Sequence, residues 1–131
     1  MTVAPREPVW LDVAIALAVH DRQLAEHGGG SGVRDITLLE SALARPINRW
    51  AYGDDDPAML AAAYAFGIGR NHAFIDGNKR TAWVLVRLFL DLNGHRLSFT
   101  TEDAIAAMLA LASGDLAEDA LADWFRTRLV R

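Results

Sequence analysis

The sequence predicts an all-α domain of about six helices, and two observations support this prediction. Alanine supplies 23 of the 131 residues, and 52% of the residues are apolar, as expected of a compact helical protein. Apolar residues recur at helical spacing, for example at Leu11, Ile15 and Val19. There is no cysteine, which excludes a disulfide framework, a thiolate zinc site and a cysteine nucleophile. The length suits a single domain over residues 1–131, and neither a repeat nor a linker divides the chain.

The boundaries of the helices follow from local signals. The first helix ends at the glycines 28–30, a polar loop covers residues 31–35, and Pro46 is expected to close a short second helix. Asp56 is expected to cap a third helix that has Pro57 at its first position. We expect helices over residues 11–27, 36–44, 57–70, 78–93, 101–113 and 117–129, and a short strand over residues 96–99.

The fourth expected helix is apolar around its whole circumference between Trp83 and Leu92. We therefore expect it to be the central, buried helix of the bundle. It stops at Asn93 and Gly94.

Charge and hydropathy exclude two classes of partner. The net charge of −4 argues against a broad nucleic-acid surface, which needs a basic footprint. The apolar stretches 13–19 and 82–92 are shorter than the ~20 residues of a membrane span. We expect a soluble, cytoplasmic protein that binds neither membrane nor nucleic acid directly, and the absence of cysteine suits a reducing compartment.

One stretch, residues 71–82 (NHAFIDGNKRTA), concentrates side chains that carry chemistry. His72 has the one side chain there whose ordinary pKa suits proton transfer near neutral pH. Asp76 offers a hard oxygen ligand of the kind that Mg²⁺ prefers. Phe74 stands between polar neighbours and is expected to anchor the loop as an apolar peg.

The residues after Asp76 suit an anion. Gly77 allows a tight turn, and Asn78 opens a helix whose first N–H groups have no partner within the helix. Lys79 and Arg80 add two cations, and Lys79 is the only lysine among the 13 basic residues. A base, a metal ligand and an anion site together predict phosphoryl or nucleotidyl transfer to a hydroxyl.

Simpler explanations exist for each polar residue taken alone. The stretch could be an ordinary loop in which Asn78 caps a helix and His72 is a surface or core histidine. The carboxylates of residues 54–56 are explained by capping. His20 and His27 lie two turns apart on one helix, which is too far to chelate one ion.

Residues 72–81, HAFIDGNKRT, resemble the signature H-x-F-x-[D/E]-G-N-[G/K]-R of the Fic/Doc superfamily, and the Doc (death-on-curing) branch is the closer match. The resemblance extends over nearly the whole chain through the segments HDRQLAEHGG, SGVRD, LLESALARP and AYAFGIGRNH. It implies a single-domain Fic/Doc helical bundle that uses ATP and Mg²⁺.

The resemblance also implies roles for individual residues. His72 would deprotonate the target hydroxyl, and Asp76 would hold Mg²⁺ on the nucleotide phosphates. The residues that would bind nucleotide and phosphate are Gly77, Asn78, Lys79 and Arg80. The residues that would belong to a flap that clamps the substrate are Gly32, Val33, Arg34 and Asp35.

Doc-type proteins are toxins that phosphorylate elongation factor Tu and stop translation, so the resemblance implies a Ser/Thr kinase activity and a Phd-like antitoxin. A Fic-like AMP-transferase is the alternative, and a catalytically inactive helical binding module is an alternative of another class. Lys79 replaces a glycine of the Fic AMP-transferases, and Trp83 replaces their second arginine, whereas Gly77 is the Fic-like choice. Ala73 replaces the usual proline. A self-inhibitory Ser/Thr-x-x-x-Glu-Gly/Asn motif is not found.

Overall fold

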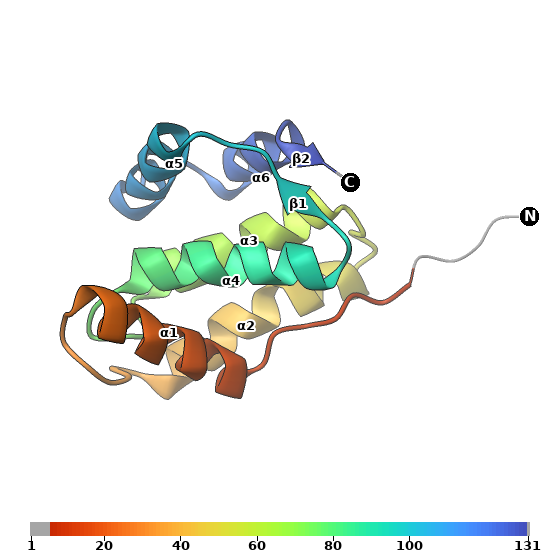
Figure 1. The fold of residues 1–131 in the computed structure, drawn as a ribbon. Helices are drawn as coiled ribbons and strands as arrows, with labels where there is room; N and C mark the ends of the chain where they lie inside the picture. Colours follow the sequence, from red (N-terminus) through yellow and green to blue (C-terminus); the bar gives the residue numbers. More distant parts are fainter. Residues whose placement is uncertain (1–5, 131) are drawn as a thin grey trace, which may run out of the picture.

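The computed structural model describes residues 6–130 as six helices with one two-stranded sheet at the side (Figure 1). The elements are α1 (Val13–His27), α2 (Ile36–Ala51), α3 (Pro57–Asn71), α4 (Asn78–Leu92), β1 (Arg96–Leu97), α5 (Thr101–Ser113), α6 (Glu118–Arg126) and β2 (Leu129–Val130). The prediction of an all-α fold of about six helices is confirmed.

Helix α3 lies at the centre of the bundle and packs against α2, α4, α5 and α6. Ten of its 15 residues are buried, and five of the ten are alanines, whose small side chains let neighbouring helices approach. Gly67 lets the backbone of α2 come close, because a β-carbon there would lie 3.0 Å from the Cα of Ala42 in α2. The most buried helix is thus α3, whereas α4, expected at the centre, buries one face and exposes Lys79, Arg80 and Arg87.

Helix α2 corrects the prediction that a short helix ends near Pro46. The helix continues through Pro46 to Ala51. Proline lacks the N–H that would bond the carbonyl four residues earlier, so its place inside a helix is costly. Pro46 is buried, and α2 packs along α3 over its length, so tertiary packing outweighs the local penalty.

An ion network fastens α2 to α6. Glu118 is only 8% exposed, and its carboxylate accepts hydrogen bonds from Arg45 at 2.8 and 2.9 Å and from Arg49 at 2.7 Å. Burial raises the pKa of Glu118, but the hydrogen bonds and charges of the two arginines outweigh it and lower that pKa overall.

The C-terminal segment also differs from the prediction of one helix to residue 129. Helix α6 ends at Arg126, and β2 pairs with β1 in antiparallel register, Arg96 opposite Val130. The predicted strand is confirmed for Arg96–Leu97 only. Among residues 6–130, no helix is both long and apolar enough to cross a membrane.

Candidate active site

The chemistry-bearing stretch forms the loop between α3 and α4. His72 ends α3 in the left-handed conformation, with φ 52° and ψ 47°, and its side chain is exposed. It is the one non-glycine residue with positive φ in the described part of the chain. Such a conformation costs a residue with a β-carbon roughly 1–2 kcal/mol, so the surrounding contacts must impose it.

Arg34 supplies part of that constraint. Its guanidinium donates hydrogen bonds to the main-chain oxygens of His72 at 2.8 Å and of Asn71 at 3.3 Å. The last carbonyls of a helix have no hydrogen-bond partners within the helix, and a cation near them interacts favourably with the negative end of the helix dipole. Arg34 therefore holds the end of α3 where His72 leaves it.

The four residues expected to form a flap lie beside the motif loop. Val33 forms a β-bridge with Phe74, and the carbonyl of Gly32 accepts a bond from the N–H of Ile75 at 3.2 Å. The N–H groups of Arg34 and Asp35 both donate to the carbonyl of Ala73, at 2.7 and 3.1 Å.

Two of these flap residues have side chains that hold the fold. Arg34 binds the end of α3, and the carboxylate of Asp35 accepts from the N–H groups of Thr37 and Leu38 and caps α2. Clamping of a substrate by this segment stays a prediction.

Phe74 and Asn78 fix the middle of the loop. Phe74 is 1% exposed, and its main-chain N–H and carbonyl each bond the side-chain amide of Asn78 at 3.0 Å. Both ends of that amide are thus occupied within the loop. The side chain of Asn78 therefore holds the loop, and its main-chain N–H at the start of α4 is still the group expected to face an anion.

Asp76 is exposed at the turn before α4. One carboxylate oxygen accepts a bond from the N–H of Gly77 at 2.7 Å. The other lies close to Gly29, where a β-carbon would sit 2.6 Å from it. Glycine at position 29 therefore leaves room for this carboxylate, a contact that the sequence does not reveal.

The start of α4 offers unsatisfied donors next to that carboxylate. Gly77 precedes the helix with φ 77°, and no described side chain caps it. Lys79 and Arg80 are exposed and form no ion pair with any carboxylate of residues 6–130. An open pocket of about 650 Å³ is lined by His72, Ile75, Asp76, Gly77, Asn78, Lys79, Arg80 and Ala112. The structure thus brings every residue of the predicted base, metal and anion sites to one pocket.

A metal ion would need help from a substrate here. The described residues contain no cluster of three His, Cys, Asp or Glu side chains that could hold an ion. Mg²⁺ is commonly bound by one or two carboxylates together with substrate phosphates. Asp76 beside an uncapped helix start and two cations fits a magnesium nucleotide better than a free ion.

His20 is the site residue that sequence reasoning missed. It lies on α1, is 1% exposed, and its ring stacks on that of Phe74 with centroids 3.8 Å apart. Its Nε2 lies 2.8 Å from the main-chain oxygen of Asp76. From the sequence, His20 was considered only as a metal ligand, because no local signal pairs it with a loop more than fifty residues away.

Comparison with known proteins identifies the family of this chain. The model of the Fic/DOC family matches residues 10–90. Toxin Doc of Mycolicibacterium smegmatis is 42% identical over 100 residues, which are 72% of this chain and 76% of that protein. Protein kinase doc of Escherichia phage P1 is 32% identical over 111 residues, which are 84% of this chain and 87% of that protein. The chain belongs to the Fic/DOC family.

Proposed function

We propose that this protein is a Doc-type toxin that transfers the γ-phosphate of ATP to a serine or threonine hydroxyl of a target protein. One observation carries the proposal: His72, Asp76, Lys79 and the uncapped start of α4 line a single open pocket. The names of the two relatives, a toxin and a protein kinase, support the same reading.

The residues divide the reaction between them. His72 accepts the proton of the target hydroxyl, whose oxygen then forms a bond to the γ-phosphorus while the bond to the departing ADP breaks. Lys79, Arg80 and the first N–H groups of α4 bind the phosphate charge. Asp76 would hold Mg²⁺, which neutralises charge on the phosphate oxygens when bound.

Phosphorylation is favoured over AMP transfer by the residues around the pocket. Lys79 adds a long cationic side chain where the Fic AMP-transferases have glycine. Trp83, at the place of their second arginine, packs edge-on to Phe99 and does not line the catalytic pocket. Gly77, the one Fic-like choice, has a local reason, since its φ of 77° suits glycine.

The test is incubation of the purified protein with a bacterial lysate and with purified elongation factor Tu, using ATP labelled on the α or the γ phosphate. We expect γ label on a protein of the lysate, and on elongation factor Tu if the target is that implied by the resemblance. His72→Ala and Asp76→Asn should lose the transfer, and Lys79→Gly should weaken it. Label from the α phosphate would establish AMP transfer instead, and no label from either would favour an inactive binding module.

Toxicity is tested separately in cells. Expression of the intact chain should arrest growth, and His72→Ala expressed to the same level should not. Harmless expression of a protein that phosphorylates its target in vitro would contradict the toxin proposal and leave the kinase proposal intact.

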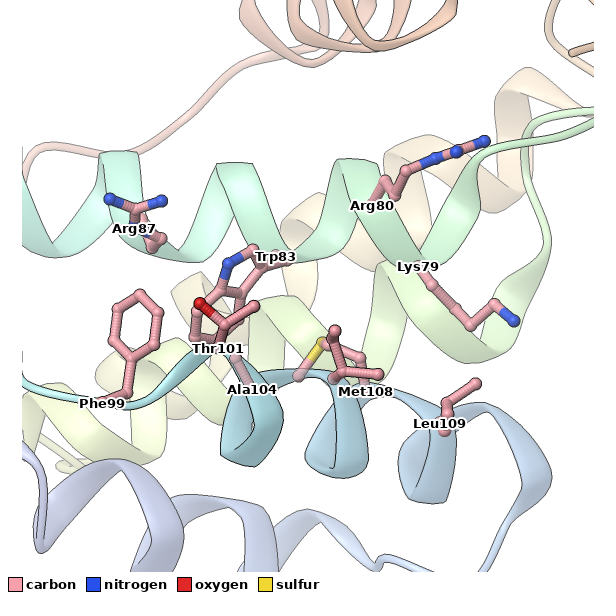
Figure 2. Close-up of a pocket in the computed structure, with 10 residues that line it drawn as sticks. Lys79, Arg80, Trp83, Arg87, Phe99, Thr101, Ala104, Met108 and Leu109 are labelled. Atoms are coloured by element: carbon pink, nitrogen blue, oxygen red, sulfur yellow. The ribbon is translucent and has the colours of Figure 1, made fainter. Parts of the chain in front are cut away.

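A groove between α4 and α5 supports the expectation of an antitoxin (Figure 2). It has a volume of about 440 Å³, and its apolar walls come from both helices. Figure 2 shows Trp83 of α4 and Met108 of α5 between the two helices, and Ile105 and Leu109 are 55% and 53% exposed. Exposed apolar side chains gathered in a groove are typical of a site for a partner helix.

Charge favours an acidic partner for this groove. Three basic residues of α4 border the groove: Lys79, Arg80 and Arg87 (Figure 2). None of them forms an ion pair with a carboxylate of the described residues. Lys79 and Arg80 also line the catalytic pocket, so an occupant of the groove would reach the phosphate site. We therefore assign the groove to an acidic amphipathic helix of a Phd-like antitoxin.

Co-expression with the neighbouring antitoxin gene should restore growth. Ile105→Asp or Leu109→Asp should prevent that rescue without reducing toxicity, because these side chains lie outside the catalytic pocket. The matched control is Ile47→Asp, an exposed isoleucine on α2 outside the groove, which should be rescued normally. Rescue of the groove variants as complete as that of the control would refute this docking site.

A further inference from the structure

His20 is a buried histidine that touches the catalytic loop at two points. Its ring is nearly parallel to that of Phe74, at an interplanar angle of 8°, and its Nε2 lies 2.8 Å from the carbonyl oxygen of Asp76. A carbonyl only accepts hydrogen bonds, so Nε2 carries a hydrogen and donates it. The structure thereby fixes where one hydrogen of this ring sits.

The loop has few other attachments at its metal-binding end. The flap bonds the main chain of Ala73 and Ile75, and Asn78 bonds that of Phe74. At Asp76 the main-chain carbonyl is bound by His20, and the carboxylate is bound by the next N–H along the chain. Among residues 6–130, the bond from His20 is therefore the one that ties Asp76 to another helix.

We propose that His20 is a positioning residue of the phosphoryl-transfer site. Its Nε2–H holds the main chain of Asp76, and its ring supports Phe74, so that the Asp76 carboxylate faces the pocket before a magnesium nucleotide arrives. The inference rests on the proposed function, because it assigns to Asp76 the binding of Mg²⁺. Residues that orient a metal ligand commonly change metal affinity or activity by about 10–100-fold when they are lost.

Two substitutions separate the hydrogen bond from packing. His20→Phe keeps a flat ring against Phe74 and removes the donor. His20→Gln keeps an N–H donor at a similar reach and removes the ring. His27→Phe is the matched control, since His27 lies on the same helix and is exposed.

The affinity of each folded protein for Mg²⁺ with a non-hydrolysable ATP analogue is measured by calorimetry. We expect His20→Phe to bind about 10-fold or more weakly than the parent, His20→Gln to recover much of the affinity, and His27→Phe to match the parent. Binding by His20→Phe within twofold of the parent would overturn the proposal. Equal weakening in His20→Phe and His20→Gln, with both folded, would overturn the role of the hydrogen bond.

A second measurement does not depend on nucleotide. Amide hydrogen exchange at residues 74–77 should quicken in His20→Phe and stay near the parent rate in His20→Gln, and NMR should show the hydrogen on Nε2 in the parent. If the parent binds no magnesium nucleotide but the exchange pattern holds, the proposed function fails and the positioning of the loop stands. Unchanged exchange in His20→Phe would overturn the positioning.

Discussion

Replacement of His72 by glycine should remove activity and raise stability at the same time. The residue sits at φ 52°, where a β-carbon costs roughly 1–2 kcal/mol. Glycine does not have this cost, but it increases the conformational entropy of the unfolded chain, which lowers stability by about 0.5–1 kcal/mol. The midpoints of these two ranges leave a net gain of about 0.8 kcal/mol in the free energy of unfolding. For a domain of this size, that corresponds to a rise of about 3 °C in melting temperature.

His72→Ala is the matched control, because alanine keeps the β-carbon and hence the strain. The imidazole is exposed, so the alanine variant loses few packing contacts. The melting temperature of His72→Ala should therefore stay within about 1 °C of that of the parent. Both variants should lose phosphate transfer by a factor of about 10²–10⁴, the usual contribution of a general base.

The parent, His72→Gly and His72→Ala are compared by thermal melts and urea titrations, which measure stability. Phosphate-transfer assays on the same preparations measure activity. A glycine variant no more stable than the alanine variant would refute the strain argument. Transfer within tenfold of the parent in both variants would refute the assignment of His72 as the base.

Three further predictions concern the scaffold. Glu118→Gln should lower the free energy of unfolding by about 2 kcal/mol at pH 7, because it leaves two arginines without their carboxylate. The folded pKa of Glu118 lies below the unfolded value of about 4.3, so this contribution to stability is complete above pH 4.3 and disappears as pH falls through the folded pKa. Urea titrations from pH 3 to 7 should therefore show the free energies of unfolding of the parent and of Glu118→Gln converge in acid. A difference that stays constant with pH would contradict this. Gly67→Ala should destabilise the protein by about 1–3 kcal/mol, because the new β-carbon meets the backbone of α2. Gly69→Ala should cost less, because its β-carbon meets only the end of the Leu111 side chain. Equal melting temperatures of the two variants would contradict this prediction. Thr81→Val should leave the free energy of unfolding unchanged or raise it by up to about 1 kcal/mol, because the buried hydroxyl of Thr81 has no hydrogen-bond partner among the described residues. A loss of more than about 1 kcal/mol in urea titrations would show that the hydroxyl does have a partner.

Several helix ends were predictable from local signals, although α1 begins at Val13 after its cap Asp12 and not at residue 11 as expected. Asp56 caps α3 with Pro57 behind it, and Gly114 ends α5 in the left-handed conformation. Pro46 misled the prediction because its local penalty is offset by packing against α3, which no sequence window contains. The end of α6 was missed for a similar reason, since β2 forms only by pairing with β1, over thirty residues earlier.

The candidate site shows the same division. The residues expected to act as base, metal ligand and phosphate-binding cations belong to one contiguous motif, and the structure places them in one pocket because they share one short loop and the start of α4. The residues that support this loop come from elsewhere in the chain. His20 and Gly29 approach it only once α1 and the segment after it have folded against it, so no pattern along the chain could identify them. Arg34 was expected in the flap, but its bonds to the end of α3 were not.

Lys79, the single lysine of the chain, borders both the catalytic pocket and the α4–α5 groove. An amine-reactive reagent therefore has one side-chain target in this protein, and that target lies where nucleotide and antitoxin are expected. The rate of its acylation, followed by mass spectrometry, becomes a direct reporter of occupancy that needs no engineered probe. Slower acylation with nucleotide alone, with antitoxin alone or with both would reveal whether the two ligands compete for one surface or share it.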